Sequence, residues 1–387
     1  MSQPRPALAG IVLFWESIDI ETVLYQCRRR NPGILFASTG SHHLFHFLNK
    51  PSAFGKLTDK NHWIQFKHAG WSYLTYPLRL MADQIQIACL LAKLLLKTRR
   101  PIPVALLNHL YHMPAFLLLR KIGLVRRLVY VSGDWLADQH VSGRFWSRIG
   151  SRIAFPWFDR LACAGSDRVL QITKRSKNAR EKYWGKKIVR DEEYFFAPIK
   201  AHFKKMLPAL RRNRILFLGA VRADSGLELL LPILKELHRR HGIRLKLAGP
   251  IDTWTDTLAR QIKQLGLQQA VQITGSFDRI NLLSLTSDCF CGLNLSTDRR
   301  NFSRYTLPAK SLDYLQYGLP IVTNTHIGEM AEWVRRKKLG AVISLQSEAL
   351  GKTLRLLFKN QKTYRRNISD FLEKYEGTDF GKFFPAA

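Results

Sequence analysis

Short apolar runs alternate with amphipathic stretches through the second half of the chain, and this alternation constrains the fold more than any other feature. Apolar runs bounded by Gly or Pro predict buried strands, and stretches with a period near 3.6 predict helices between them. Strands are expected at residues 214–218, 244–247, 271–274, 289–295 and 321–323, and helices at 226–240, 256–265, 280–287, 309–317 and 329–337. Such alternation predicts a parallel sheet with helices on both faces, the doubly wound α/β fold.

The first half carries the same alternation in a weaker form. Strands are expected at residues 8–14, 104–107, 127–131 and 168–172, and helices at 81–97, 113–121 and 174–183. A basic, poorly periodic segment then runs up to Arg214, so we place a domain boundary near residue 205. The fold class is therefore α/β, with two doubly wound, Rossmann-like domains at 1–205 and 206–387 that face a cleft, the second closed by a helical tail.

Composition excludes a disordered or disulfide-stabilised chain. Apolar residues make up 46% of the sequence, and its 22 Phe, 12 Tyr and 9 Trp suffice for a core in each domain. The 5 Cys are scattered and form no CxxC pair, which indicates a reducing compartment and predicts no metal site. Cys289 and Cys291 alternate within a strand-like run and are expected in the core.

A formal net charge of +32 predicts wide basic surfaces that attract phosphate groups. Residues 61–100 combine aromatic rings with Lys and Arg beside an apolar stretch, a composition that suits the headgroups of an anionic membrane. The alternatives are a core helix with a solvated end, or binding to nucleic-acid phosphates. The sequence contains no helix-turn-helix, RNA-binding signature or zinc pair that would favour nucleic acid.

No segment has the pattern of a signal peptide or a membrane span. The apolar run at residues 7–15 is short and soon meets acidic residues. The run at 85–96 contains Lys93 and falls short of the ~20 apolar residues that a spanning helix needs. We therefore expect a cytoplasmic protein that contacts the inner face of the cell membrane peripherally.

Loops at the expected carboxyl ends of the second-half strands carry candidate binding residues, because ligands of doubly wound sheets bind at that edge. The first loop, residues 219–226, begins at Gly219, so backbone amides would approach an anion there and Arg222 would add charge. An ordinary turn is the alternative. Gly249 and Gly275 end the next two strands.

The second loop leads into a helix through Pro308, which suits a first helical turn because its missing N–H costs nothing there. The helix start offers a positive dipole end with Lys310 beside it, an arrangement suited to a diphosphate. Asp313 lies one turn further on the same face and would accept hydrogen bonds from ribose hydroxyls, unless it forms a surface ion pair with Lys310. The third loop, 323–329, ends at Glu329, where helix capping is the alternative to binding.

These residues together resemble the donor-binding domain of GT-B glycosyltransferases. The resemblance covers about residues 212–345 and is carried by the strand-end glycines and above all by PAKSLDYLQYGLPIV and TNTHIGE. The version of the helix that carries Lys and an acid, as here, is similar to that of bacterial enzymes that build lipid-linked surface polysaccharides. In those enzymes this region holds a nucleoside diphosphate-sugar. The resemblance implies diphosphate binding at Lys310 and ribose binding at Asp313, with Glu329 in the same site.

The sequence departs from this family pattern at three positions. The usual Arg after the first glycine is Ala220, and the usual Lys before the second is Ser225, so Arg222 is left to supply that charge. Retaining members carry a second acid eight residues before the ribose-binding one, and Tyr305 stands there. Tyr305 favours an inverting enzyme, and a retaining enzyme is the alternative.

The N-terminal half supplies a candidate base. Inverting transfer needs a carboxylate that removes the proton of the acceptor hydroxyl, and Asp134 follows the expected strand at 127–131. The stretch RLVYVSGDWLAD resembles the segment around the catalytic Asp of the membrane-associated glucuronosyltransferases of xanthan assembly, which are inverting GT-B enzymes. Asp138 is the second choice, and helix capping is the alternative role for Asp134. His109 and His112 are candidates for contact with the sugar or the acceptor.

We therefore expect a glycosyltransferase that moves a sugar from a nucleoside diphosphate-sugar, with a UDP-sugar favoured, to a lipid-linked saccharide in surface polysaccharide assembly. The donor is a co-substrate, and neither a further cofactor nor a metal is expected. The expected partners are the donor, the acceptor and an anionic membrane surface, without nucleic acid. The alternatives are a retaining enzyme and a non-catalytic basic protein that binds nucleic acid or membrane.

Overall fold

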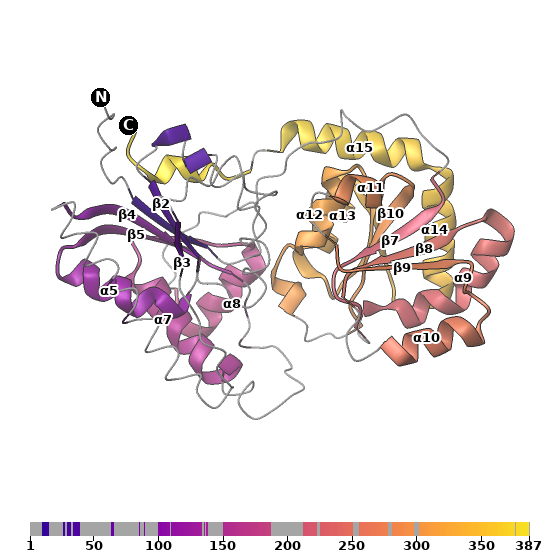
Figure 1. The fold of residues 1–387 in the computed structure, drawn as a ribbon, viewed down its shortest axis with the longest axis horizontal. Helices are drawn as coiled ribbons and strands as arrows, with labels where there is room; N and C mark the ends of the chain where they lie inside the picture. Colours follow the sequence, from indigo (N-terminus) through magenta and orange to yellow (C-terminus); the bar gives the residue numbers. More distant parts are fainter. Residues whose placement is uncertain are drawn as a thin grey trace. The chain divides into compact units, whose positions relative to one another are not determined.

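The structure, a computed structural model, divides into two compact units (Figure 1): Met1–Pro198 with Glu376–Ala387, and Ile199–Tyr375. It describes residues 10–14, 26–27, 29–31, 34–38, 63–65, 85, 89, 100–108, 110–133, 135, 137, 150–186, 212–222, 225–250, 255–277, 281–297, 302–375 and 377–386. The division at Pro198 falls within residues 187–211, outside these ranges and close to the boundary expected near 205.

The first unit is built on a parallel sheet whose described strands follow the order β3-β2-β1-β4-β5-β6. These strands are β1 (Gly10–Phe14), β2 (Ile34–Ser38), β3 (Trp63–Gln65), β4 (Ile102–Leu107), β5 (Val125–Val131) and β6 (Arg168–Leu170). Its described helices are α5 (Met113–Lys121), α7 (Phe155–Gly165) and α8 (Lys174–Trp184). Along β5, Leu128 and Tyr130 join the core under α5 and α7, whereas Val129 and Val131 join a second core, so both faces of the sheet are covered.

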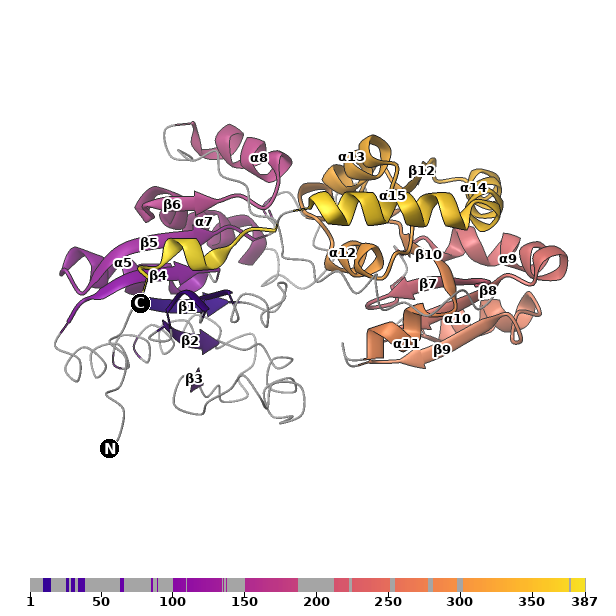
Figure 2. The same ribbon diagram turned by 90° about the horizontal axis from the view of Figure 1, so that it is seen from above.

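The end of the chain packs on the first unit (Figure 2), which corrects the assignment of the whole tail to a 206–387 domain. Phe380, Phe383 and Phe384 lie in one buried cluster with Val129 of β5. The amide of Phe380 donates to Oε1 of Gln26 at 3.2 Å. The aromatic rings of the tail thus supply the apolar cover that the second face of this sheet needs.

The second unit repeats this architecture, with the strand order β12-β11-β10-β7-β8-β9. Its strands are β7 (Arg214–Leu218), β8 (Arg244–Ala248), β9 (Val271–Gly275), β10 (Cys289–Asn294), β11 (Ile321–Asn324) and β12 (Gly340–Ile343). Its described helices are α9 (Leu227–His241), α10 (Thr255–Gln264), α11 (Leu282–Thr286), α12 (Ala309–Gln316), α13 (Gly328–Lys337), α14 (Ser347–Lys359) and α15 (Gln361–Lys374). In both sheets successive strands are added from a central strand to one edge, and the next strand in the chain then pairs on the other side of that central strand. This reversal falls between β1 and β4 in the first sheet and between β7 and β10 in the second.

The doubly wound prediction is confirmed in both units. The strands and helices expected in the second half are present with ends that shift by a residue or two, and Cys289 and Cys291 are buried as expected. The sequence analysis did not anticipate β2, β3, α7, β12 or α15. The helix expected at 81–97 lies outside the described residues apart from Ile85 and Cys89.

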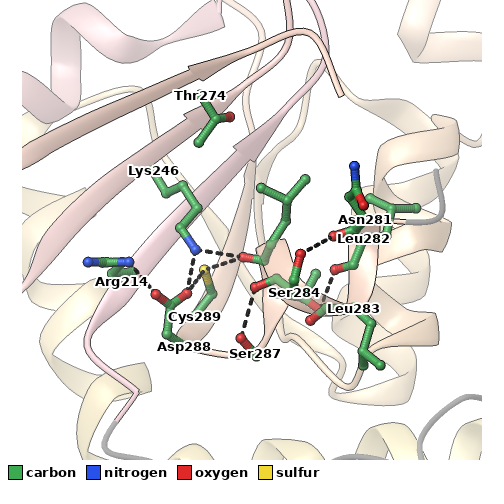
Figure 3. A network of polar contacts seen from close by, with 12 residues as sticks. Arg214, Lys246, Thr274, Asn281, Leu282, Leu283, Ser284, Ser287, Asp288 and Cys289 are labelled. Atoms are coloured by element: carbon green, nitrogen blue, oxygen red, sulfur yellow. Dashed lines mark hydrogen bonds and ion pairs between the residues drawn. The ribbon is translucent and has the colours of Figure 1, made fainter. Parts of the chain in front are cut away.

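A polar network fixes the edge of the second sheet where its strands begin (Figure 3). Lys246 of β8 is buried, and its Nζ donates to the Leu285 carbonyl at 3.0 Å and to Oδ1 of Asp288 at 2.6 Å. Arg214 pairs with the other oxygen of Asp288. Burial alone would raise the pKa of Asp288, but the hydrogen bond and charge of Lys246, with the charge of Arg214, hold that pKa below its usual value.

We predict that acid weakens the second unit through Asp288. A carboxylate whose pKa is lower in the folded than in the unfolded chain stabilises the fold above its unfolded pKa, and that contribution is lost as pH falls through the folded pKa. The urea midpoint of wild type should therefore exceed that of Asp288→Asn at neutral pH, and the gap should shrink below about pH 4. The exposed Asp370→Asn is the control, and a gap that does not change with pH would contradict the prediction.

Candidate functional site

The candidate residues of the second unit follow the carboxyl ends of its strands, around the point where the winding reverses. There β7 and β10 pair in parallel, with Leu216 opposite Gly292. In doubly wound sheets the connections leave two such strands toward opposite faces, and the crevice between them binds ligands. The strand order therefore selects the ends of β7 and β10 as the place to examine.

Gly219, Gly249 and Gly275 end three neighbouring strands and are joined by backbone hydrogen bonds. The amide of Gly219 donates to the carbonyl of Ala248 at 2.8 Å, and that of Gly249 donates to the carbonyl of Gly275 at 2.7 Å. All three glycines have positive φ, of 97°, 149° and 67° respectively. A Cβ on Gly249 would lie 2.1 Å from the Gly219 carbonyl oxygen, so only glycine allows the two chains to approach so closely.

The loop at 219–226 is closed by Ser225, the residue that replaces the Lys of the family pattern. Its Oγ accepts the amide hydrogen of Arg222 at 3.0 Å, and its own amide donates to the Arg222 carbonyl at 3.1 Å. Ser225 is buried, whereas the Arg222 side chain is exposed. Ser225 therefore shapes the turn, and Arg222 presents its positive charge to solvent.

Lys310 lies above the end of β7. Its Nζ is 4.3 Å from the centroid of the Phe217 ring, a cation–π contact, and the side chain is half-buried. The nearest atom to a Cβ on Gly219 would be Cε of Lys310, at 4.0 Å. Since α12 begins just before Lys310, directly after Pro308, its positive dipole end adds to the ammonium charge. This end of β7 thus carries a positive charge beside a glycine backbone.

Tyr314 ties α12 to both strands of the switch point. Its hydroxyl accepts the amide hydrogen of Leu218 in β7 at 2.9 Å and donates to the carbonyl of Leu293 in β10 at 3.1 Å. The side chain is completely buried, which raises the pKa of the phenol. A Cβ on Gly292 would lie 2.3 Å from the ring, so glycine at that position makes room for it.

A further contact fixes the same helix. Nδ2 of Asn294 in β10 donates to Oγ of Ser311 in α12 at 2.6 Å. Asp313, between Ser311 and Tyr314 in the chain, is buried with 9% of its surface exposed. The helix is therefore held on the sheet by residues on either side of Asp313, and Lys310 and Asp313 lie one helical turn apart.

A second pair of loops meets at the ends of β10 and β11. Asn324 accepts the amide hydrogen of Ser296 at 3.1 Å and donates to its carbonyl at 2.8 Å, and Nδ1 of His326 lies 2.9 Å from that carbonyl. Glu329 lies half-buried in the first turn of α13. The sequence analysis did not single out His326, whose fixed ring became evident only from its contact with a residue thirty positions away.

The Tyr305 position, where retaining relatives would carry an acid, is occupied by a packed aromatic ring. The guanidinium of Arg304 lies 4.4 Å from the centroid of the Tyr305 ring, and Arg304 also donates a hydrogen bond to its hydroxyl. A Cβ on Gly328 would lie 1.8 Å from the Arg304 carbonyl oxygen, so this loop packs tightly against the start of α13.

Of the candidate residues in the first unit, the structure describes His112. Asp134, Asp138 and His109 lie outside the described residues, and their roles stay predictions. His112 is described and is completely buried at the start of α5. Among the described residues no group of three or more His, Cys, Asp or Glu side chains is arranged to hold a metal ion.

Comparison with known proteins agrees with this geometry. Residues 198–370 match the family model of glycosyl transferases group 1. Among solved structures, the chain is similar to HepE from Anabaena in complex with UDP and glucose, with 14% identity, 95% of each chain covered and a TM-score of 0.64. It is also similar to a sucrose-phosphate synthase from Thermosynechococcus elongatus, with 12% identity, 95% of this chain and 94% of that one covered and a TM-score of 0.66.

A third similar structure is WaaG, described as a glycosyltransferase involved in lipopolysaccharide biosynthesis. It shares 13% identity and a TM-score of 0.60 over 95% of this chain and 96% of that one. No curated protein matches the chain in sequence. At these identities the solved structures show a common fold of two Rossmann-like domains.

We predict that Lys310 and Asp313 bind different parts of one nucleotide. Lys310→Ala should weaken binding of UDP but not of uridine, because it removes the charge that faces the diphosphate. Asp313→Ala should weaken both, because the ribose is common to them. Each loss should be about 1–3 kcal/mol, the range for a charged hydrogen bond, measured by titration calorimetry. Lys352→Ala, an exposed change on α14, is the control, and unchanged UDP affinity in both variants would remove this site.

Proposed function

We propose that this chain is a GT-B glycosyltransferase that transfers a sugar from a UDP-sugar to a lipid-linked saccharide; residues 198–370 match glycosyl transferases group 1. The single observation that carries the donor half of this proposal is the position of Lys310 at the switch point, with its ammonium over the Phe217 ring and its Cε next to Gly219. Asp313 would accept the ribose hydroxyls one turn further along. HepE, of similar fold, has been solved with UDP and with UDP-glucose, which supports a uridine nucleotide.

The acceptor half rests on charge and on the nature of similar proteins. The net charge of +32 favours a substrate that sits at an anionic surface. WaaG is involved in lipopolysaccharide biosynthesis, and WaaB, which has a TM-score of 0.60 to this chain, is a lipopolysaccharide outer core galactosyltransferase. Both names support a lipid-linked saccharide as the acceptor and surface polysaccharide assembly as the process.

An exposed face at the start of α7 supports membrane contact. Ile153 and Trp157, four residues apart, are 64% and 56% exposed, and Arg152 and Arg160 beside them are exposed as well. Apolar and aromatic side chains flanked by Arg suit the headgroup layer of an anionic bilayer. No helix within the described ranges combines the length and the apolarity needed to cross a bilayer.

We predict that vesicles containing anionic lipid sediment the protein at low salt and release it at high salt, because salt screens the basic side chains. The double variant Ile153→Ser, Trp157→Ala should lower the bound fraction about tenfold, since it removes two apolar side chains from the interface. Leu356→Ser, an exposed apolar change on α14, is the control. Equal binding to neutral and anionic vesicles would contradict the membrane role, and retention on random RNA alone would favour nucleic acid.

The proposed chemistry is a single displacement with Asp134 as the base. The carboxylate takes the proton of the acceptor hydroxyl while the hydroxyl oxygen attacks the anomeric carbon of the donor sugar. The bond from that carbon to the diphosphate oxygen breaks, and UDP leaves with the electron pair from the opposite face. The product therefore has the anomeric configuration opposite to that of the donor. His109 would contact the sugar or the acceptor.

We predict that Asp134→Asn keeps the fold and the UDP affinity but lowers turnover by roughly 100-fold to 10,000-fold, the contribution of a positioned base. The amide is nearly isosteric with the carboxylate but cannot accept the proton. Asp138→Asn is the matched comparison and should leave turnover near normal. NMR of the product linkage tests inversion independently of either variant.

Near-normal turnover in Asp134→Asn would move the base to Asp138 or His109. Retention of configuration would instead favour the retaining alternative, against which the aromatic residue at Tyr305 stands.

A further inference from the structure

The first unit contains a buried ion pair, separate from the residues proposed to bind the donor. The side chains of Asp159 in α7 and Arg180 in α8 are completely buried, and Nε of Arg180 lies 2.9 Å from Oδ2 of Asp159. Nη2 of Arg180 donates to Oδ1 of the same carboxylate at 3.0 Å, and the Tyr130 hydroxyl of β5 donates to that oxygen at 2.8 Å. The carboxylate is thus held from a helix and from the sheet at once.

Stability alone gives little reason for such a pair. Two buried charges lose their hydration, and apolar side chains of similar volume often stabilise a core as well or better. Burial lowers the pKa of Arg180, but the charge of Asp159 more than compensates and raises that pKa above its ordinary value, so the guanidinium stays charged. A planar, permanently charged group with donors on several sides can serve several acceptors at fixed positions.

The other hydrogen bonds of Arg180 reach residues that follow the ends of β5 and β6. Nη2 lies 3.3 Å from the Gly133 carbonyl, and Nη1 donates to Oε1 of Gln171 at 3.2 Å. The guanidinium also lies 5.5 Å from the centroid of the Trp135 ring. Gly133 and Trp135 are the residues on either side of Asp134 in the chain, so Arg180 contacts both neighbours of the proposed base.

The described residues of this segment are fixed by contacts with neighbouring elements. Gly133 has no side chain, and a Cβ there would meet nothing within 4 Å. Before it, the amide and Oγ of Ser132 both donate to the carbonyl of Leu170 in β6, at 2.8 and 2.9 Å. After it, Trp135 is 1% exposed and packs edge-on against aromatic rings of α7 and α8, namely Phe155, Tyr183 and Trp184. Arg180 contacts both flanks of the proposed base, through the Gly133 carbonyl and the Trp135 ring.

We infer that Arg180, held in place by Asp159, is a positioning residue that fixes Gly133 and Trp135 and through these two neighbours serves the proposed base. The inference rests on the proposed function for its catalytic consequence, but the fixing of the backbone can be measured without it. A catalytic group must be held within about half an ångström of its productive position, and a misplacement of 1 Å can cost about 100-fold in rate.

The test is Arg180→Lys, which keeps a charge beside Asp159 but replaces a fork of donors by one ammonium that cannot reach the carboxylate, Gln171 and Gly133 together. Amide hydrogen exchange of a peptide covering residues 130–137 should accelerate about tenfold, as local opening becomes easier. The kcat should fall by roughly 10-fold to 100-fold while KM for the donor stays constant. Arg120→Lys is the matched control, because Arg120 also pairs with a carboxylate, Asp167, and donates to a backbone carbonyl, that of Gly165.

Unchanged exchange in residues 130–137 would overturn the inference. Faster exchange with unchanged kcat would support the hold on the backbone and instead remove Asp134 as the base, so the two failures are distinguishable. Should Arg180→Lys fail to fold, the double variant Asp159→Leu, Arg180→Met removes both charges together, which buried pairs commonly tolerate. It should show the same local acceleration and the same loss of kcat, and normal values of both would overturn the inference.

Discussion

The arrangement of α12 on the second sheet depends on the two hydrogen bonds of the Tyr314 hydroxyl. This hydroxyl accepts from the Leu218 amide in β7 and donates to the Leu293 carbonyl in β10, so one oxygen serves backbone groups of two strands. A backbone N–H and C=O that lose such a partner inside the protein cost about 1–3 kcal/mol each. The same contact sets where α12 lies, because Tyr314 belongs to that helix and Gly292 leaves the room for its ring. The hydrogen bonds of Tyr314 to the strand backbones therefore also help to position Lys310, which lies on the same helix.

In each unit a side chain from a helix forms hydrogen bonds with backbone groups at the end of a strand, but the two side chains differ in charge. Both sheets reverse their winding at the centre, and in both a helical side chain reaches the carboxyl end of a strand. In the second unit that side chain is a neutral phenol that satisfies two backbone groups. In the first unit it is Arg180, which needs Asp159 to offset its own buried charge. Burying the neutral phenol costs less desolvation free energy than burying the guanidinium, whereas the guanidinium reaches more acceptors.

The sequence predicts the sheets well because strands buried on both faces have continuous apolar sequences, as β7 does after Arg214. It fails for β3, which is only three residues long, and for the tail, whose Phe380 meets Gln26 across 354 positions. The candidate site likewise has a part that the sequence predicts and a part that it does not. The place of Lys310 and Asp313 at the start of a helix was predictable from a local motif, but the partners of Tyr314 and Arg180 are set by packing between segments far apart in the sequence. The polar sequence of α8 predicts a solvated helix, yet its Arg180 is completely buried.

The loop after β7 shows how the charge of the proposed donor site is distributed. Ala220 and Ser225 stand where the family pattern has two cations, and the exposed Arg222 is screened by solvent and salt. Lys310, half-buried over Phe217, is screened less, so a diphosphate would depend chiefly on a charge carried by a helix. A charge on a helix is only as well placed as the helix itself. In this chain the proposed donor affinity and the packing of the switch point consequently depend on the same buried contacts, those of the Tyr314 hydroxyl and of Ser311, and a change that loosens α12 would weaken both together.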